Sequence, residues 1–298
     1  MGWKPTQIGD LGGRRVIVTG ANSGIGAVQA RELATHGAQV VLAVRDVEAG
    51  RAVAATIDGA TSVEQLDLAS QESVRRFAEA VDGPIDLLVN NAGVMAPPRY
   101  RTTADGHELQ FGTNHLGHFA LTARLLPALL AAPAPRVTTV SSIAHHRGDD
   151  RVVEGNPPSG YTPNLSYGQS KLANLLFALE LHRRAAAAGS QLTSTAAHPG
   201  VARTNLVASR DGMGASWFVR TLVPPLMRLA LPGADGGAES ILYAATTAEP
   251  GSYSGPQRFG EVRGPVGPAR LSRWASDEEL ARRLWSRSEE LTGLAFTV

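Results

Sequence analysis

The feature that most constrains the fold is a glycine-rich turn between a short apolar run and a helical pattern. Val16 to Thr19 are mostly β-branched and are typical of a buried strand. Residues 20–26 follow with Gly-Ala-Asn-Ser-Gly-Ile-Gly, and a helical pattern continues to His36 and Gly37. Strand, glycine turn and helix in this order predict the first unit of a dinucleotide-binding fold, in which the helix N-terminus receives a pyrophosphate. The alternative is a turn that only joins strand to helix.

A tyrosine and a lysine four residues apart form the second informative pattern. Tyr167 and Lys171 lie in a segment that is expected to be helical to about Gly189, so both side chains should share one face. A nearby ammonium favours phenolate and should lower the tyrosine pKa from ~10 towards neutrality. This pair is therefore a candidate general acid and base, and the alternative is an ordinary surface pair.

Strand and helix patterns alternate along the chain. We expect strands at 15–19, 39–44, 63–66, 85–90, 136–140, 192–197 and near 252–254. We expect helices at 25–36, 47–57, 70–81, 103–131, 167–189, 234–247 and 277–292. This alternation predicts one α/β domain over 1–298, a doubly wound Rossmann fold with a seven-stranded parallel sheet of order 3-2-1-4-5-6-7. Ser276 with Glu279 predicts a capping box for the last helix, and Gly293 its end.

Three segments leave the prediction open. Residues 143–166 are polar and rich in Gly and Pro, and they indicate a long loop beside the active site. Residues 205–233 are apolar and interrupted by Pro224-Pro225, so they are either a buried helix or a mobile lid over an apolar pocket. The apolar side of the helix after Tyr167 carries Leu172, Leu175, Leu176 and Leu179. That side could be core or the interface of a homodimer or homotetramer.

Together the motifs resemble the short-chain dehydrogenase/reductase family. Thr19 to Gly26 are similar to its cofactor turn, and Tyr167 with Lys171 to its active-site motif. Asn90-Asn91-Ala92-Gly93 is similar to a third family segment, and Pro199-Gly200 with Thr204 to a fourth. The segments 114–119 and 140–146 most resemble the retinol dehydrogenase and WW-domain oxidoreductase branch.

The resemblance implies a set of site residues. Asn114 and Ser142 stand where the family places its other two catalytic residues, and Asp67 where it holds the adenine. The implied cofactor contacts are Gly20, Asn22, Ser23, Gly24, Ile25, Gly26, Arg45, Asp67, Leu68, Asn91, Ala92, Gly93, Tyr167, Lys171, Pro199, Gly200, Val201 and Thr204.

The catalytic roles follow in the carbonyl-reducing direction. Tyr167 should donate a proton to the oxygen as hydride arrives, while Lys171 lowers the tyrosine pKa and reaches the ribose. Ser142 should hydrogen-bond the same oxygen. Ser141 is the alternative, but neighbours in a strand point to opposite faces and the family pattern favours the second serine. Asn114 should hold a water that relays protons.

Arg45 bears on the choice of cofactor. It follows Val44 at the end of the second strand, where relatives that use NAD usually place an acidic residue in the position of Val44. An arginine there suits a 2′-phosphate, so NADP(H) is preferred. Asp46 is adjacent and keeps NAD(H) possible; the alternative is a surface Arg-Asp pair.

Composition excludes several kinds of partner. The chain has 298 residues, a formal charge of +1 and no cysteine, which speaks against nucleic acid, disulfides and thiolate zinc sites. His115, His118, His145 and His146 have no recognised metal-ligand spacing, so no metal is expected. Residues 1–13 lack a signal-peptide core and no run approaches a transmembrane span, unlike anchored retinol dehydrogenases. We therefore expect a cytoplasmic protein.

The sequence thus favours an NADP(H)-preferring oxidoreductase that acts on a small lipophilic alcohol or carbonyl. An enoyl or quinone reductase is an alternative, although the Tyr-Lys spacing speaks against enoyl reduction. A nucleotide-binding regulator or scaffold on the same fold is the alternative from another class. Such proteins commonly lose the tyrosine or the lysine, and this chain has both.

Overall fold

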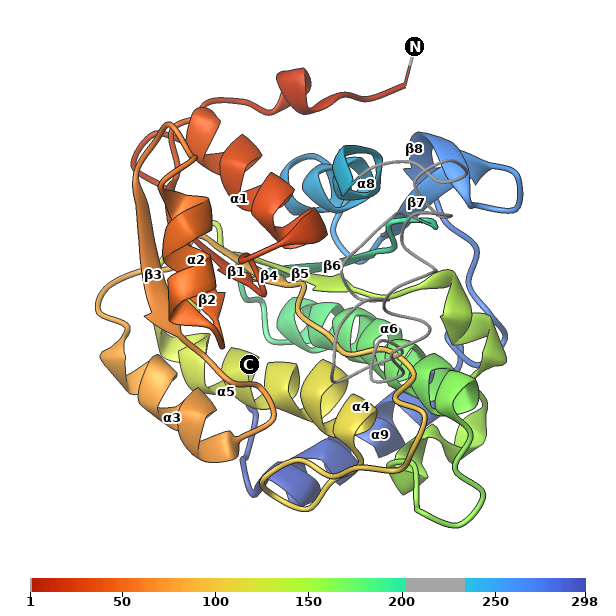
Figure 1. Cartoon of the computed structure of the whole chain (residues 1–298). Helices are drawn as coiled ribbons and strands as arrows, with labels where there is room; N and C mark the ends of the chain where they lie inside the picture. The colour runs from red at the N-terminus through yellow and green to blue at the C-terminus, as the bar shows by residue number, and fades with distance from the viewer. Residues whose placement is uncertain (1, 202–233) are drawn as a thin grey trace.

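The computed structural model describes residues 2–201 and 234–298, and within them a single twisted sheet runs through the molecule (Figure 1). Its eight strands have the order β3-β2-β1-β4-β5-β6-β7-β8. The strands are β1 (Arg15–Thr19), β2 (Gln39–Val44), β3 (Thr61–Gln65), β4 (Leu87–Asn90), β5 (Arg136–Val140), β6 (Thr193–Ala197), β7 (Tyr253–Arg258) and β8 (Arg263–Pro268). Strands β1 to β7 are parallel, which confirms the predicted order.

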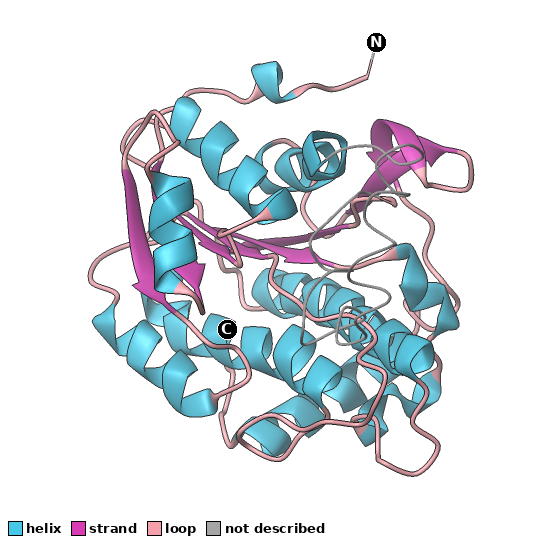
Figure 2. Cartoon of the chain, viewed as in Figure 1, coloured by secondary structure: helices cyan, strands magenta, loops and turns pink. Residues whose placement is uncertain are grey.

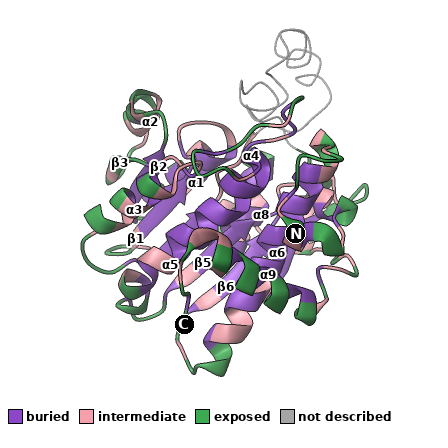
Figure 3. Cartoon of the chain, turned by 90° about the horizontal axis from the view of Figure 1, so that it is seen from below, coloured by how far each residue is buried: buried purple, intermediate pink, exposed green. Residues whose placement is uncertain are grey.

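Helices cover both faces of the sheet (Figure 2). They are α1 (Gly24–Thr35), α2 (Val47–Ala54), α3 (Gln71–Ala80), α4 (Leu109–Phe111), α5 (Gly117–Leu130), α6 (Pro163–Ala187), α8 (Ala234–Thr246) and α9 (Glu278–Thr292). Val16 and Val18 of β1 pack with α1 and α8, while Ile17 packs with α3, α5 and α6 on the opposite face. The inner strands β2, β1, β4, β5 and β6 and the inner sides of α5 and α6 are consequently buried, whereas the edge strands β3 and β8 are largely not (Figure 3). Burial on both faces explains why β1 is apolar without alternation.

The prediction of a seven-stranded, wholly parallel sheet was wrong at one edge. Strand β8 pairs antiparallel with β7, with Gly255 opposite Gly267 and Pro256 opposite Val266. Its sequence is Arg-Gly-Pro-Val-Gly-Pro, and glycine and proline are depleted in strands. Proline is tolerated at a sheet edge because no further strand needs its missing N–H. Local propensity therefore conceals this strand.

The helix expected at 103–131 begins later and is not regular. Thr102 and Glu108 form an isolated antiparallel bridge, and Glu108 caps the helix by accepting from the N–H groups of Gln110 and Phe111. A π-helical turn, η2 (Gly112–Leu116), then joins α4 to α5. Such turns widen a helix locally and often occur at functional sites. This one contains Asn114.

The helix ends differ from expectation in two places. Asp277, not Ser276, caps α9, because its Oδ1 accepts from Leu280 N at 2.9 Å. Ser276 instead donates to Ser272 O, so the predicted capping box was wrong. Gly293 ends α9 at φ 66°, as predicted. Helix α6 begins at Pro163, and the preceding loop contains two 3-10 turns, η3 (Ile143–Arg147) and η4 (Asp150–Glu154).

The apolar side of α6 belongs to the core of the chain itself. Leu172, Leu175 and Leu176 are fully buried in one cluster with Leu280 and Leu284 of α9. Of the two alternatives for this side, the structure therefore shows core. Residues 205–233, the lid-or-core segment, lie outside the described residues. In the parts of the chain that the structure describes, no helix combines the length and apolarity needed to cross a membrane.

Candidate active site

The glycine turn lies at the carboxyl end of β1, as predicted. Gly20 and Gly24 have φ values of 68° and 56°, in the left-handed region that favours glycine. A Cβ on Gly26 would stand 2.5 Å from Gly20 O and 2.7 Å from Asn91 Nδ2. Helix α1 starts at Gly24, with Ser23 as its N-cap residue. Only glycine is tolerated at position 26, and the first N–H groups of α1, which have no partner within the helix, lie at this turn.

The segment after β4 is fastened to this turn. Thr19 Oγ1 accepts from Asn91 N and from Ala92 N, each at 2.9 Å. Asn91 Nδ2 donates to Thr19 O at 2.8 Å. A Cβ on Gly93 would lie 3.1 Å from Asn114 Oδ1 and 3.6 Å from Lys171 Nζ. The Asn-Asn-Ala-Gly segment therefore connects the glycine turn to the predicted catalytic residues.

The four predicted catalytic residues come together at the carboxyl ends of β4 and β5. Ser142 follows β5, Asn114 lies in the π turn, and Tyr167 with Lys171 lies on α6. Gly168 allows α6 to approach η3, since a Cβ there would be 2.8 Å from Ala144 O. Ser142 forms a side-chain hydrogen bond with Tyr167. Ser141 Oγ instead donates to Lys171 O at 2.8 Å, which places Ser142 and not Ser141 beside the tyrosine.

Asn114 anchors its surroundings through its whole amide. Its Oδ1 accepts from Val94 N at 2.8 Å, and its Nδ2 donates to Val94 O at 3.0 Å and to Ser170 Oγ at 2.9 Å. The side chain is fully buried. Both amide N–H groups are therefore used within the protein, so the expected relaying water would have to donate to an oxygen of Asn114, and both oxygens already have one partner, Val94 N on Oδ1 and His118 Nδ1 on the backbone oxygen.

The expected lowering of the tyrosine pKa by the lysine was wrong for this structure. Burial raises the pKa of Tyr167 to about 12, with the Ser142 hydrogen bond opposing the shift. Burial lowers the pKa of Lys171 to about 8. Lys171 Nζ lies 5.8 Å from the centroid of the Tyr167 ring and donates to Val140 O at 3.1 Å. Desolvation outweighs the charge interaction because the ammonium is directed to a backbone carbonyl rather than to the phenol oxygen.

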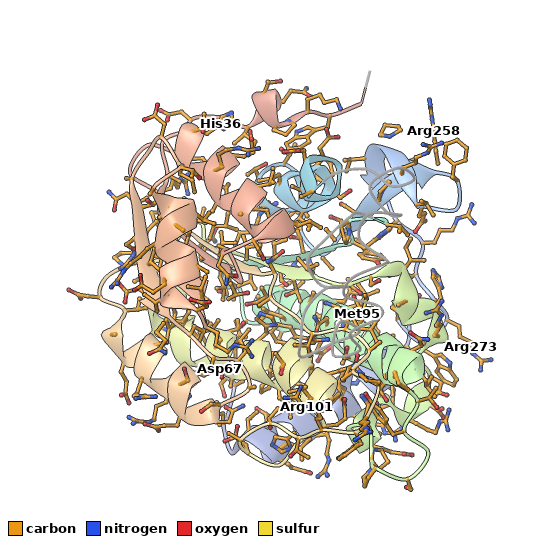
Figure 4. The ribbon with its side chains drawn as sticks, in the orientation of Figure 1. His36, Asp67, Met95, Arg101, Arg258 and Arg273 are labelled. Atoms are coloured by element: carbon orange, nitrogen blue, oxygen red, sulfur yellow. The ribbon has the colours of Figure 1, made fainter. Side chains whose placement is uncertain are left out.

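The remaining predicted cofactor positions follow other parallel strands of the same sheet, β3 and β6. Asp67 and Leu68 follow β3, where Asp67 Oδ1 accepts from Ala69 N at 2.9 Å and Leu68 is buried against Gly117. Figure 4 labels Asp67 there and Met95 on the segment that leads from β4 towards α4. Pro199, Gly200 and Val201 follow β6, and Gly200 has a φ of 69°. Thr204 lies outside the described residues.

Arg45 and Asp46 follow β2, and both are exposed. Asp46 is the N-cap of α2, and its Oδ1 accepts from Ala49 N at 3.0 Å. One carboxylate oxygen of Asp46 thus has a structural partner, which the sequence alone did not indicate.

Sequence reasoning missed the polar residues that hold the site from behind. Thr19 Oγ1 contacts His118 Nε2 at 2.9 Å, and His145 Nδ1 contacts Ser142 O at 2.8 Å. Tyr253 of β7 hydrogen-bonds Ser141. Both histidines lie in the segments 114–119 and 140–146 that resemble the retinol dehydrogenase branch, and this resemblance was the one indication in the sequence. Over residues 2–201 and 234–298, no three His, Asp or Glu side chains gather as metal ligands.

Comparison with known proteins agrees with this geometry. The family model of short chain dehydrogenases matches residues 14–213. Human retinol dehydrogenase 13 is 42% identical over 291 residues, which cover 95% of this chain and 85% of the relative. The crystal structure of an uncharacterized protein from Mycobacterium paratuberculosis is 46% identical, with a TM-score of 0.84 and full coverage of both chains.

A further solved structure contains a nucleotide. A short chain dehydrogenase from Escherichia coli CFT073, complexed with NADPH, is 25% identical and covers 69% of this chain and 83% of its own, with a TM-score of 0.54. The match of the family model to most of the chain, together with the high identity of full-length relatives, decides the assignment. This chain belongs to the short-chain dehydrogenase family of oxidoreductases, which act on CH–OH groups.

Proposed function

We propose that this enzyme interconverts a lipophilic alcohol and its carbonyl compound, with NADP(H) as the preferred cofactor. The observation that carries the proposal is the cluster of Ser142, Tyr167, Lys171 and Asn114 beside Gly93 and the glycine turn. The residues fit a dinucleotide, because Gly20 and Gly24 at positive φ and the close approach of Gly26 to Gly20 O form a tight turn before the N-terminus of α1, which can receive a pyrophosphate. A nicotinamide bound there would supply or accept the hydride.

In this proposal the protein residues handle the proton. Tyr167 donates its phenolic proton to the substrate oxygen, and its pKa of about 12 keeps it protonated before the reaction. Ser142 donates to the same oxygen and fixes its position. Lys171 has a pKa of about 8, so it exchanges a proton near neutral pH, but its Nζ donates to Val140 O and not to the phenol, so a proton that it returns to the tyrosine has to pass through a relaying water. Asn114 holds the segment at Val94 and the helix at Ser170, which keeps these groups in register.

Separate observations support the lipophilic substrate and the preference for NADP(H). Retinol, in the name of the human relative, is a lipophilic alcohol, and residues 205–233 contain Trp217, Phe218 and several leucines. The relative from E. coli CFT073 is complexed with NADPH, and Asp46 is engaged as a helix cap beside the exposed Arg45. Arg45 can offer paired donors to a 2′-phosphate, whereas a capping carboxylate is less able to accept from ribose hydroxyls.

The catalytic assignment is tested by Tyr167→Phe with a panel of aldehydes, ketones and quinones. We expect turnover to fall about 10²–10⁴-fold, the usual contribution of general acid catalysis, with little change in NADPH affinity. Tyr243→Phe is the matched control, because Tyr243 lies on α8 and packs against Trp3. Retention of most activity in Tyr167→Phe would refute the assignment. NADPH binding without turnover of any substrate would favour the regulator or scaffold.

The cofactor preference is tested by Arg45→Ala in fluorescence titrations with NADPH and NADH. A hydrogen bond to a charged group corresponds to about ten- to a hundredfold in affinity, so NADPH should weaken by that factor and NADH hardly at all. Arg51→Ala removes the same charge from an exposed position on α2 and should leave both affinities nearly unchanged. Equal weakening of both cofactors by Arg45→Ala would contradict a contact with the 2′-phosphate.

A further inference from the structure

His118 connects two parts of the site from within the core. It lies on α5 with 1% of its surface exposed. Its Nδ1 is 2.9 Å from Asn114 O, and its Nε2 is 2.9 Å from Thr19 Oγ1. A carbonyl oxygen can only accept, so we assign the proton to Nδ1. In the neutral ring Nε2 is then an acceptor, and the Thr19 hydroxyl donates to it.

This assignment satisfies the Thr19 hydroxyl completely. A hydroxyl has one donor and two acceptor sites. The proton of Thr19 has the nearer acceptor in His118 Nε2 at 2.9 Å and a second one in Val89 O at 3.3 Å, and the lone pairs of the hydroxyl receive Asn91 N and Ala92 N. The backbone beside the glycine turn is thereby linked through Thr19 and His118 to Asn114.

His145 makes the corresponding link to Ser142. Its Nδ1 is 2.8 Å from Ser142 O, and its Nε2 accepts from Ser272 N at 3.2 Å. A backbone N–H can only donate, so Nε2 carries no proton and Nδ1 does. His145 is fully buried, like His118. Both rings therefore have the same tautomer. In each, Nδ1–H donates to the backbone carbonyl of a site residue, and Nε2 accepts from a donor that is distant in the sequence.

We propose that His118 and His145 are positioning residues that hold Asn114 and Ser142 in place as neutral imidazoles with the proton on Nδ1. The inference rests on the proposed function, because Asn114 and Ser142 matter through the reaction. A second proton, on Nε2, would remove the acceptor of either ring. It would bring an N–H against the proton of the Thr19 hydroxyl in His118 and against Ser272 N–H in His145. His118 should fix the position of the Asn91-Ala92 backbone, which is predicted to contact the cofactor. His145 should fix the position of the Ser142 hydroxyl beside Tyr167.

The electrostatic surroundings favour the neutral rings. Burial lowers the pKa of both His118 and His145 to about 4. The positive charge of Lys171 opposes protonation of His118, whereas its other titratable neighbour, His115, is itself neutral because burial lowers its pKa to about 3. His146, His198, Glu261 and Tyr253 face His145, and of these only Glu261 favours the charged ring.

The test compares His118→Leu with His145→Leu in two separate measurements. We expect His118→Leu to weaken NADPH binding about tenfold or more in fluorescence titration, since the backbone of Asn91 and Ala92 loses its support. We expect His145→Leu to leave NADPH affinity nearly unchanged and to lower kcat about ten- to a hundredfold, the effect of a displaced catalytic group. Thr19→Val breaks the first link from its other end and should reproduce the weaker binding.

Conservative variants keep the test decisive where a leucine prevents folding. His145→Asn can still donate to Ser142 O, and His118→Gln can still accept from Thr19. Each should recover activity or binding relative to its leucine variant. Lower thermal stability with wild-type kcat and wild-type NADPH affinity would overturn the proposal. If the wild type binds NADPH but turns over no substrate, the proposed function fails, and the titrations of His118→Leu and Thr19→Val still decide the first link.

Discussion

Acid should destabilise this enzyme well before its carboxylates are protonated, because the core contains neutral histidines. Burial lowers the pKa of His115 to about 3 and that of His118 to about 4, against about 6.5 in an unfolded chain. Between these values the unfolded state binds protons that the folded state does not. Stability is therefore complete above pH 6.5 and is lost as the pH falls towards 4.

The size of the loss follows from proton linkage. Each such histidine changes the free energy of unfolding by about 1.4 kcal/mol per pH unit, or about 2 kcal/mol between pH 6.5 and pH 5. His115 and His118 together should then remove about 4 kcal/mol, a large part of the ~5–15 kcal/mol of a typical protein, and His145 and His198 add to the loss because burial lowers their pKa to about 4 as well. Glu108 acts in the opposite direction, since burial raises its pKa. The depressed pKa of Lys171 has its effect above pH 8 and not in this range.

Urea denaturation at several pH values between 7 and 5 measures this slope. His115→Phe should reduce it by about one proton, because the ring already packs 5.1 Å from that of Phe111 and 6.1 Å from that of Phe119. Phe119→Leu, in the same cluster, should lower stability at every pH and leave the slope unchanged. A wild-type free energy of unfolding that is constant from pH 7 to pH 5 would refute the reasoning, as would an unchanged slope in His115→Phe.

Two further changes test the local geometry. Gly26→Ala should weaken NADPH binding at least tenfold in titration, because its Cβ would meet backbone at 2.5 Å. Gly9→Ala is the control, since its Cβ would meet nothing within 4 Å, and it should leave the affinity unchanged. Equal NADPH affinities of the two variants would show that the turn adapts. Asp277→Ala should lower the free energy of unfolding by about 1 kcal/mol in urea melts, and Ser276→Ala by much less. The reverse order would restore Ser276 as the cap.

The fold was predictable where a local pattern and a topological rule coincide. β1, the glycine turn and α1 follow from residues 16–36, and the strand order follows from alternation of parallel units. Strand β8 was not predictable, because its pairing comes from β7 and not from its own Gly and Pro residues. The π turn at Gly112–Leu116 has no marker in helix propensity either.

The sequence predicted which site residues lie close together better than it predicted their pKa values. Motif spacing indicated Ser142, Tyr167 and Lys171, and the structure brings them together. The sequence could not show that Lys171 Nζ bonds Val140 O, which is why the expected pKa of Tyr167 had the wrong direction. It also could not show the hydrogen bonds of Thr19, because Asn91 is 72 positions and His118 is 99 positions away from Thr19 in the chain.

Strand β8 has a consequence for how copies of this enzyme can associate. An exposed sheet edge usually offers a row of N–H and C=O groups on which another chain can add a strand. Two of the six residues of β8, Pro265 and Pro268, have no N–H to offer, and two others are glycines. The strand thus ends the sheet chemically as well as spatially. Continuous sheets across two molecules are therefore disfavoured at this edge, whereas β3 at the opposite edge has no proline to prevent such pairing.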